Sequence, residues 1–132
     1  MANEAVCIET PTIFARRTIA AAAVLPVGTI TKLTDNNTVV ATSSDNDVFG
    51  GIVWEIASTA TTTFTEITVA LDGIWDMKDS GSGGSAGAIV NVGGTNLIID
   101  SAAADLLTGS VIGKREMDSA NSEVTRIRLV GY

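Results

Sequence analysis

Residue types that usually carry enzymatic chemistry are scarce in this sequence. It contains no histidine, and Cys7 is its single cysteine. One chain therefore cannot supply a Ser-His-Asp or Cys-His mechanism, a histidine metal site or an internal disulfide bond. Cys7 belongs to an apolar, strand-like segment, where burial raises the pKa of a thiol and leaves it unreactive. The sequence predicts that the protein is not an enzyme.

Four short stretches resemble functional motifs, but each lacks a part that its chemistry requires. The Gly/Ser-rich residues 78–84 resemble the surroundings of a nucleophilic serine without a general base, and a phosphate-binding loop without the helix that should follow. The Asp/Asn turns at 35–37 and 45–47 offer oxygen ligands, but not with the spacing of a calcium loop. Residues 76–79 resemble the hairpin lysine of biotinyl carriers, without a second half-motif. Loops and turns explain all four, and we predict no cofactor and no metal.

The chain is acidic. It has 8 basic and 15 acidic residues, which gives a net charge of −7. Direct nucleic-acid binding is not expected, because phosphate binding needs clustered Lys and Arg. The basic residues form three small clusters, namely Arg16 with Arg17, Lys114 with Arg115, and Arg126 with Arg128. Each cluster is either a docking point for an acidic partner or ordinary surface charge that is paired locally.

The apolar residues favour β structure. The sequence has 13 Ile, 13 Val and 17 Thr but only 7 Leu, and β-branched side chains suit a pleated sheet better than a helix. No run of 18 apolar residues occurs, so no membrane span is predicted. The mean hydropathy of +0.34 is high for a chain with 17% charged residues. Two explanations stay open: a well-filled β core, or an apolar surface that partner chains cover.

Strand-like segments recur about every ten residues, a spacing typical of a β-sandwich or β-barrel. The clearest is 66–72, in which apolar and polar residues alternate. Trp54 and Trp75 both occupy strand positions typical of a core. Residues 81–87 are expected to form a mobile Gly/Ser loop. No internal repeat is apparent.

We therefore predict a mainly β fold with a single compact domain, like a barrel or a sandwich, over residues 18–132. One short helix is expected at about 102–107, with Asp100 or Ser101 capping its start and Gly109 ending it. Residues 1–17 are expected to form an N-terminal arm or an edge strand.

The predicted arm carries alternating apolar residues followed by two arginines. An extended segment of this kind can add to a partner's sheet through main-chain hydrogen bonds, with Phe14 anchored in a pocket and the arginines paired with acidic groups. The alternative is that the segment is the first strand of the chain's own sheet. Together with two arginines near the C-terminus, the candidate contact residues are Val6, Ile8, Ile13, Phe14, Arg16, Arg17, Arg126 and Arg128.

The order of segments along the chain matches a known kind of protein. Over residues 26–78 it is PVGTITKLTD, a turn, TVVA, an acidic loop, VFGGIV, a Thr-rich gap and EITVALDGIWDM. The stretches ANEAV near the start, SVIGK and the C-terminal RIRLV add to it. In this order the chain resembles the head-decoration (cement) proteins of tailed bacteriophages. The resemblance implies a β-rich domain that trimerises on the outside of an icosahedral capsid, with its N-terminal segment on the major capsid protein.

From this resemblance we expect a structural virion protein that is made in the host cytoplasm and located on the capsid exterior. It would stabilise the shell by bridging subunits of the major capsid protein, and its own assembly would be a homotrimer. The alternative function is a carbohydrate- or host-surface-binding β module, such as a fibre-type domain. Glycan sites usually present exposed aromatic side chains, and the sequence has only two Trp, one Tyr and three Phe.

Overall fold

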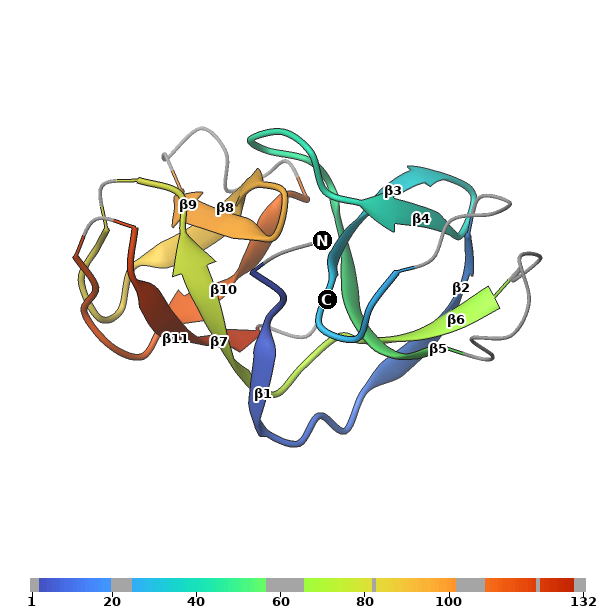
Figure 1. Ribbon diagram of the computed structural model, residues 1–132, viewed down its shortest axis with the longest axis horizontal. Coiled ribbons are helices and arrows are strands. Elements are labelled where there is room, and N and C mark those ends of the chain that lie inside the picture. The colour runs from blue at the N-terminus through green and yellow to red at the C-terminus, as the bar shows by residue number, and fades with distance from the viewer. Residues whose placement is uncertain are drawn as a thin grey trace.

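The computed structural model describes residues 3–19, 25–56, 66–81, 83–101, 109–120 and 122–129. These residues form eleven strands, β1 to β11, which confirms the mainly β fold (Figure 1). The helix predicted at 102–107 lies outside the described residues. The expected boundary between an arm of residues 1–17 and a domain of residues 18–132 falls within β2.

The first barrel consists of five strands closed in the order β2-β4-β3-β5-β6. All neighbours are antiparallel except β2 and β4, which are parallel. The strands are β2 (Phe14–Ile19), β3 (Ile30–Asp35), β4 (Thr38–Ala41), β5 (Phe49–Ile56) and β6 (Glu66–Ala70).

The second barrel is a ring of β7, β11, β10, β8 and β9 that closes through a parallel pairing of β9 with β7. Its strands are β7 (Ile74–Asp79), β8 (Ile89–Gly94), β9 (Leu97–Asp100), β10 (Val111–Arg115) and β11 (Val124–Leu129). The remaining strand, β1 (Val6–Glu9), is added antiparallel to β7. Both β1 and β2 are therefore strands of the molecule's own sheets, which is the alternative that the sequence left open.

The two barrels repeat one another. Strands β2 to β6 correspond in order to β7 to β11, and every pairing in one barrel has a counterpart of the same direction in the other. The registers of the pairings also agree. In the parallel pairings, Thr18 lies opposite Thr38 as Lys78 lies opposite Leu97. In the antiparallel pairings, Phe14 lies opposite Ala70 as Ile74 lies opposite Arg128. The sequence-based expectation of no internal repeat is therefore wrong.

Local backbone conformations repeat as well. The glycine before each hairpin has a positive φ, 92° at Gly28 and 91° at Gly87, a conformation that side chains with a Cβ rarely adopt. The second turn residue of each hairpin, Asn37 or Asn96, is also left-handed, with φ of 49° and 54°. Asparagine tolerates this conformation better than most residues, which explains why it stands at both turns.

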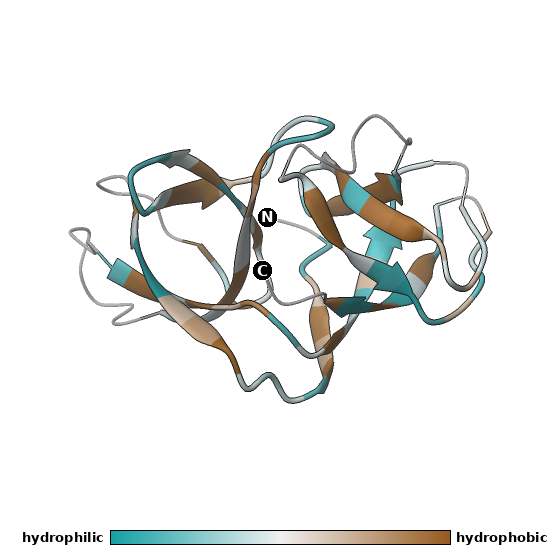
Figure 2. Ribbon diagram, turned by 180° about the vertical axis from the view of Figure 1, so that it is seen from behind, coloured by the Kyte–Doolittle hydropathy of each residue, from teal (hydrophilic) through white to brown (hydrophobic). Residues whose placement is uncertain are grey.

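A shared core holds the two barrels together. Ile30, Ile52 and Ala70 of the first barrel are fully buried and belong to the same apolar cluster as Trp75 and the interior of the second barrel. The buried amide of Asn96 adds a polar link, because its Oδ1 accepts a hydrogen bond from the Ile30 N–H at 2.9 Å. Figure 2 shows hydrophobic residues along the strands of both barrels and hydrophilic residues at many of their ends.

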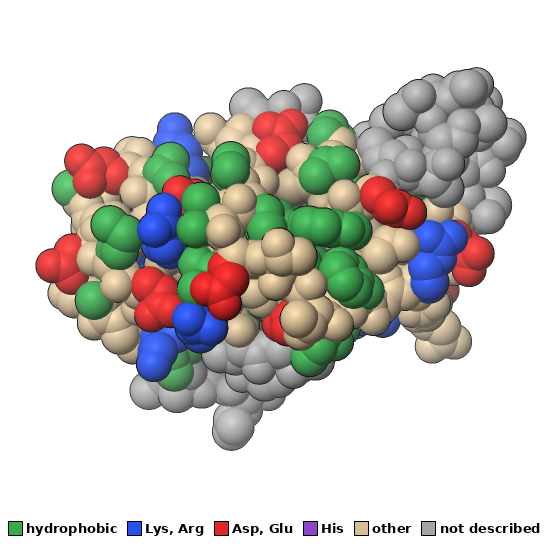
Figure 3. All heavy atoms as spheres, turned by 90° about the horizontal axis from the view of Figure 1, so that it is seen from below, with side chains coloured by type: hydrophobic (Ala, Val, Ile, Leu, Met, Phe, Trp, Pro, Cys, Tyr) green, Lys and Arg blue, Asp and Glu red, His purple; other side chains and the backbone are tan. Residues whose placement is uncertain are grey.

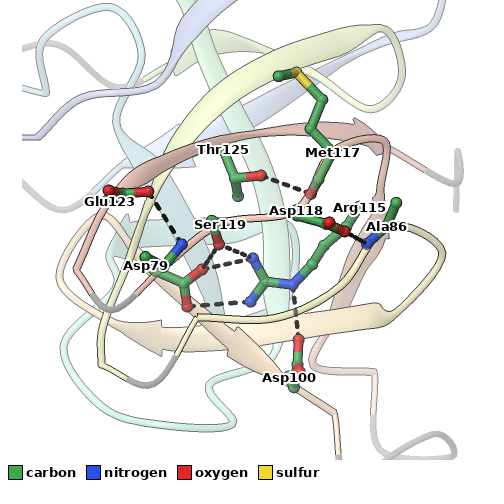
Figure 4. A network of polar contacts seen from close by, with 10 residues as sticks. Asp79, Ala86, Asp100, Arg115, Met117, Asp118, Ser119, Glu123 and Thr125 are labelled. Atoms are coloured by element: carbon green, nitrogen blue, oxygen red, sulfur yellow. Dashed lines mark hydrogen bonds and ion pairs between the residues drawn. The ribbon is translucent and has the colours of Figure 1, made fainter.

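The interiors of the two barrels differ at several equivalent positions, such as the buried Ile67 and Thr125, and at one pair of positions charged side chains replace aliphatic ones. Val53 and Ile19 are buried in the first barrel, and the corresponding residues of the second are Arg115 and Asp79. Arg115 donates from Nη2 to Asp79 at 3.1 Å, and further donates to Ser119 and Asp100 (Figure 4). A buried arginine with carboxylate partners thus replaces an aliphatic contact.

The Gly/Ser loop covers this ion pair. A Cβ added to Gly84 would lie 2.5 Å from Arg115 Nε, so only glycine fits there. The Gly84 and Ser119 backbones exchange hydrogen bonds, and Gly87 N–H donates to the Arg115 carbonyl. The described part of the loop is therefore held against the barrel, unlike the mobile loop that the sequence suggested.

Candidate interaction surface

Four exposed apolar side chains lie on β1, on the start of β2 and on the connection between them. Their exposed fractions are 60% for Val6, 44% for Ile8, 47% for Ile13 and 41% for Phe14. We call this group the arm face. Figure 3 views the molecule from the side on which β1 and this connection project in Figure 1, and shows a band of hydrophobic side chains across it. Exposed apolar area of this kind marks a contact surface more often than an isolated exposed residue does.

A hydrogen-bonded clamp fixes the connection before β2. Asp72 lies between the two barrels, and its Oδ1 accepts from the N–H groups of Thr12 at 2.7 Å and of Ile13 at 2.9 Å. Its Oδ2 accepts from the Thr12 hydroxyl at 2.7 Å. Partial burial alone would raise the pKa of Asp72, but these hydrogen bonds outweigh it and lower the pKa below its usual value. Ile13 is therefore presented on an ordered backbone.

Phe14 and Trp54 form the wall of a surface hollow on the first barrel. Their ring centroids are 5.6 Å apart, and Trp54 makes an edge contact with the buried Trp75 at 6.0 Å. The hollow measures about 370 Å³, and its lining consists of Phe14, Ala15, Arg16, Trp54, Glu55 and Thr68. The contact of Trp54 with Trp75 joins this aromatic wall to the core, and the wall offers a surface on which an apolar group can pack.

A second hollow, of about 360 Å³, lies between the barrels. Its lining consists of Glu9, Thr10, Thr12, Ile13, Asp72, Gly73, Arg128 and Leu129. The consecutive residues Ile13 and Phe14 thus line one hollow each. Because Arg128 belongs to this lining, the structure brings one predicted C-terminal arginine beside the predicted arm.

Two of the four candidate arginines belong to these hollows and remain exposed. Arg16 donates to Thr68 Oγ1 at 2.8 Å and lies 3.8 Å from a Glu66 carboxylate oxygen. Arg128 donates from Nε to Glu116 at 2.7 Å. About half of each side chain is exposed, 51% in both cases. Both retain surface from which a partner carboxylate can be bound.

The other two candidate arginines have structural contacts. Arg17 donates to the Gly50 carbonyl and to Asn37 Oδ1, within the first barrel. Arg126 is paired through Nε and Nη2 with the two carboxylate oxygens of Asp76, at 3.0 and 3.4 Å. Pairing with a local Asp or Glu, which the sequence left as an alternative for every arginine cluster, is seen for Arg126, and also for Arg16 and Arg128. Arg17 has uncharged partners instead.

Outside this surface, the described side chains that could take part in chemistry either have partners within the chain or lie apart from one another. Cys7 is half-buried, and burial raises the pKa of its thiol as expected. Asp47, in one Asp/Asn turn, accepts hydrogen bonds from the N–H groups of Ser43 and Ser44 and lies 3.4 Å from Lys32 Nζ. Within the described ranges, no three His, Cys, Asp or Glu side chains gather as a metal site. No helix among the same residues is long and apolar enough to cross a membrane.

Sequence reasoning missed two residues of this surface. It placed Trp54 in the core; the side chain does pack against the core cluster but is only half-buried, at a point where β5 shifts register against β6. It also assigned no role to Asp72. The Asp72-Gly73 pair did signal a turn, but the partners of the carboxylate are sixty residues away in sequence.

Comparison of the sequence with models of known protein families gives no match, and comparison with curated proteins gives none either.

Proposed function

We propose that this protein is a capsid decoration protein of a tailed bacteriophage. It binds the outer surface of an icosahedral capsid and stabilises the shell by bridging subunits of the major capsid protein. The observation that carries the proposal is the arm face, where exposed apolar side chains adjoin two hollows lined by Arg16 and Arg128. The order of segments over residues 26–78 supports it independently.

In this proposal the arm face is the capsid contact. Ile13 and Phe14 are the apolar anchors, since large apolar side chains beside pockets dominate binding energy at interfaces. Arg16 and Arg128 pair with acidic groups of the shell, which sets orientation and the rate of encounter. The chain assembles as a homotrimer, whose closed three-fold symmetry suits the local three-fold positions of a shell. Many copies then add their weak contacts across the particle.

One observation favours a second function, a carbohydrate- or host-surface-binding module. Phe14 and the half-buried Trp54 together line an open hollow, and sugar rings stack on aromatic side chains of this kind. The two proposals differ in what the hollow contacts: an apolar side chain of the shell in the first, and a glycan in the second.

Electron microscopy of phage shells assembled with and without the purified chain tests the first function. We expect density on the outer surface at local three-fold positions, with the arm face toward the shell. Shells that take up no protein, together with saturable binding to a glycan panel that Trp54→Ala abolishes, would replace it with the second.

A further inference from the structure

Among the residues that the structure describes, one strand edge is filled in the second barrel, and the equivalent edge of the first barrel has no strand paired to it. In the second barrel, β9 covers only the end of β7, from Lys78 to Asp79. The first half of the same edge is covered by β1, with Val6 opposite Asp76 (Figure 1). In the first barrel, β4 likewise covers only Thr18 and Ile19 of β2. No described strand pairs with the preceding residues, 14–17, on that edge.

The backbone groups at this open position face outward. The Thr18 N–H donates to the Asn37 carbonyl on the β4 side of β2. Successive residues of a strand direct their N–H and C=O groups to opposite sides. The main-chain groups of Arg16 and Phe14 therefore lie on the β4 side, like those of Thr18. The Ile13 carbonyl accepts from the Leu71 N–H on the opposite, β6 side, as this alternation requires. The Arg16 carbonyl accepts a hydrogen bond from the Asn37 side-chain amide at 2.9 Å, so the main-chain groups offered to an added strand are the Arg16 N–H and those of Phe14.

The strand on the equivalent edge shows what kind of segment fits. β1 is short and extended, pairs antiparallel and has glutamates on either side of its apolar residues, at Glu4 and Glu9. The open edge of β2 carries the exposed Phe14 and the exposed guanidinium of Arg16, in a chain whose net charge is −7. An extended apolar segment that carries a carboxylate therefore complements this edge, by strand pairing and by charge.

We propose that the open edge of β2 at Phe14 to Arg16 receives an extended segment of a partner protein as an added antiparallel strand. The segment has alternating apolar residues and a carboxylate that pairs with Arg16. That this partner is the major capsid protein rests on the proposed function. Main-chain hydrogen bonds supply the affinity, and the Phe14–Trp54 hollow beside the strand receives an apolar side chain.

Two substitutions at one residue test the edge. Arg16→Ala removes the guanidinium but keeps the backbone N–H. Arg16→Pro removes both, and proline is tolerated on an edge strand where the N–H faces solvent. We expect Arg16→Pro to bind shells about tenfold more weakly than Arg16→Ala, while thermal melts show both variants folded. Equal affinity of the two variants would overturn the inference and leave the proposed function standing.

Hydrogen–deuterium exchange of the wild-type chain provides the second measurement, and it decides alone if Arg16→Pro fails to fold. We expect the amides of Phe14 and Arg16 to become protected on bound shells, while those of Ala15 and Arg17, which face β6, change little. Unchanged exchange at Phe14 and Arg16 would overturn the inference. Protection that grows with protein concentration without shells would overturn it in favour of a second copy. A wild-type chain that binds no shell would remove the proposed function and this partner together.

Discussion

Asp72 and Thr12 are joined twice, because one carboxylate oxygen accepts from the Thr12 N–H and the other from its hydroxyl, both at 2.7 Å. This pair ties the connection between β1 and β2 to the connection between the barrels. Asp72 is thus the residue that positions Ile13 on the arm face.

Removal of this carboxylate should loosen the arm without unfolding the barrels. We expect Asp72→Ala to lower the free energy of unfolding by about 0.5–1.5 kcal/mol, since it removes hydrogen bonds whose exposed donors can then bind water. Exchange of the Thr12 and Ile13 amides should accelerate. The matched control is Asp45→Ala, at an exposed acidic residue. Unchanged amide exchange in Asp72→Ala would contradict the positioning role.

The same carboxylate predicts a pH dependence. Hydrogen bonds from Ile13 and Thr12 lower the pKa of Asp72 despite partial burial, and those from Ser43 and Ser44, with Lys32, lower that of Asp47. A group whose pKa is lowered in the folded state stabilises the fold above its unfolded pKa, near pH 4 for Asp as an approximate reference. This stabilisation is lost as the pH falls through the folded pKa.

Denaturant titrations across this pH range check that expectation. Between about pH 5 and pH 2 the wild-type chain should lose more stability than Asp72→Asn or Asp47→Asn, because neither variant can protonate at the substituted site. Parallel pH profiles for all three proteins would show that these carboxylates contribute nothing.

The buried pair of Arg115 and Asp79 predicts a strongly non-additive mutant cycle. Arg115→Val or Asp79→Ile alone should cost about 3 kcal/mol or more, since each leaves a buried charge without its main partner. The double substitution recreates the Val53 and Ile19 contact of the first barrel and should recover most of that loss. Equilibrium unfolding measures each term. A double variant as unstable as the sum of the singles would contradict the equivalence of the two interiors.

Much of the local structure could be predicted from the sequence. Alternation over residues 66–72 predicted inward-facing Ile67, Val69 and Leu71. The first two are buried, whereas Leu71 follows the end of β6 and is half-buried. Closure into two barrels could not be predicted, because it depends on parallel pairings between distant strands, β2 with β4 and β7 with β9. The repeat was hidden because equivalent core positions carry different chemistry, as with Val53 and Arg115. A backbone repeat constrains register and turn conformation more tightly than side-chain identity.

The arm face predicts which apolar side chain matters for binding. Phe14→Ala should weaken shell binding about tenfold or more, as expected for an anchor residue. Val124→Ala is the matched control, since Val124 is more exposed, at 62%, but lies outside the arm face. It should bind like the wild type. Comparable losses in the two variants, measured by co-sedimentation with shells, would contradict the assignment.

Thermal release of DNA from filled particles measures whether the protein stabilises the shell. Particles stripped of the protein are compared with particles to which the purified chain has been restored, with a dye reporting escaping DNA. We expect release at a higher temperature from the restored particles, and no such gain when Phe14→Ala is supplied at the same concentration. Equal release temperatures for stripped particles and particles saturated with the wild-type chain would contradict this expectation.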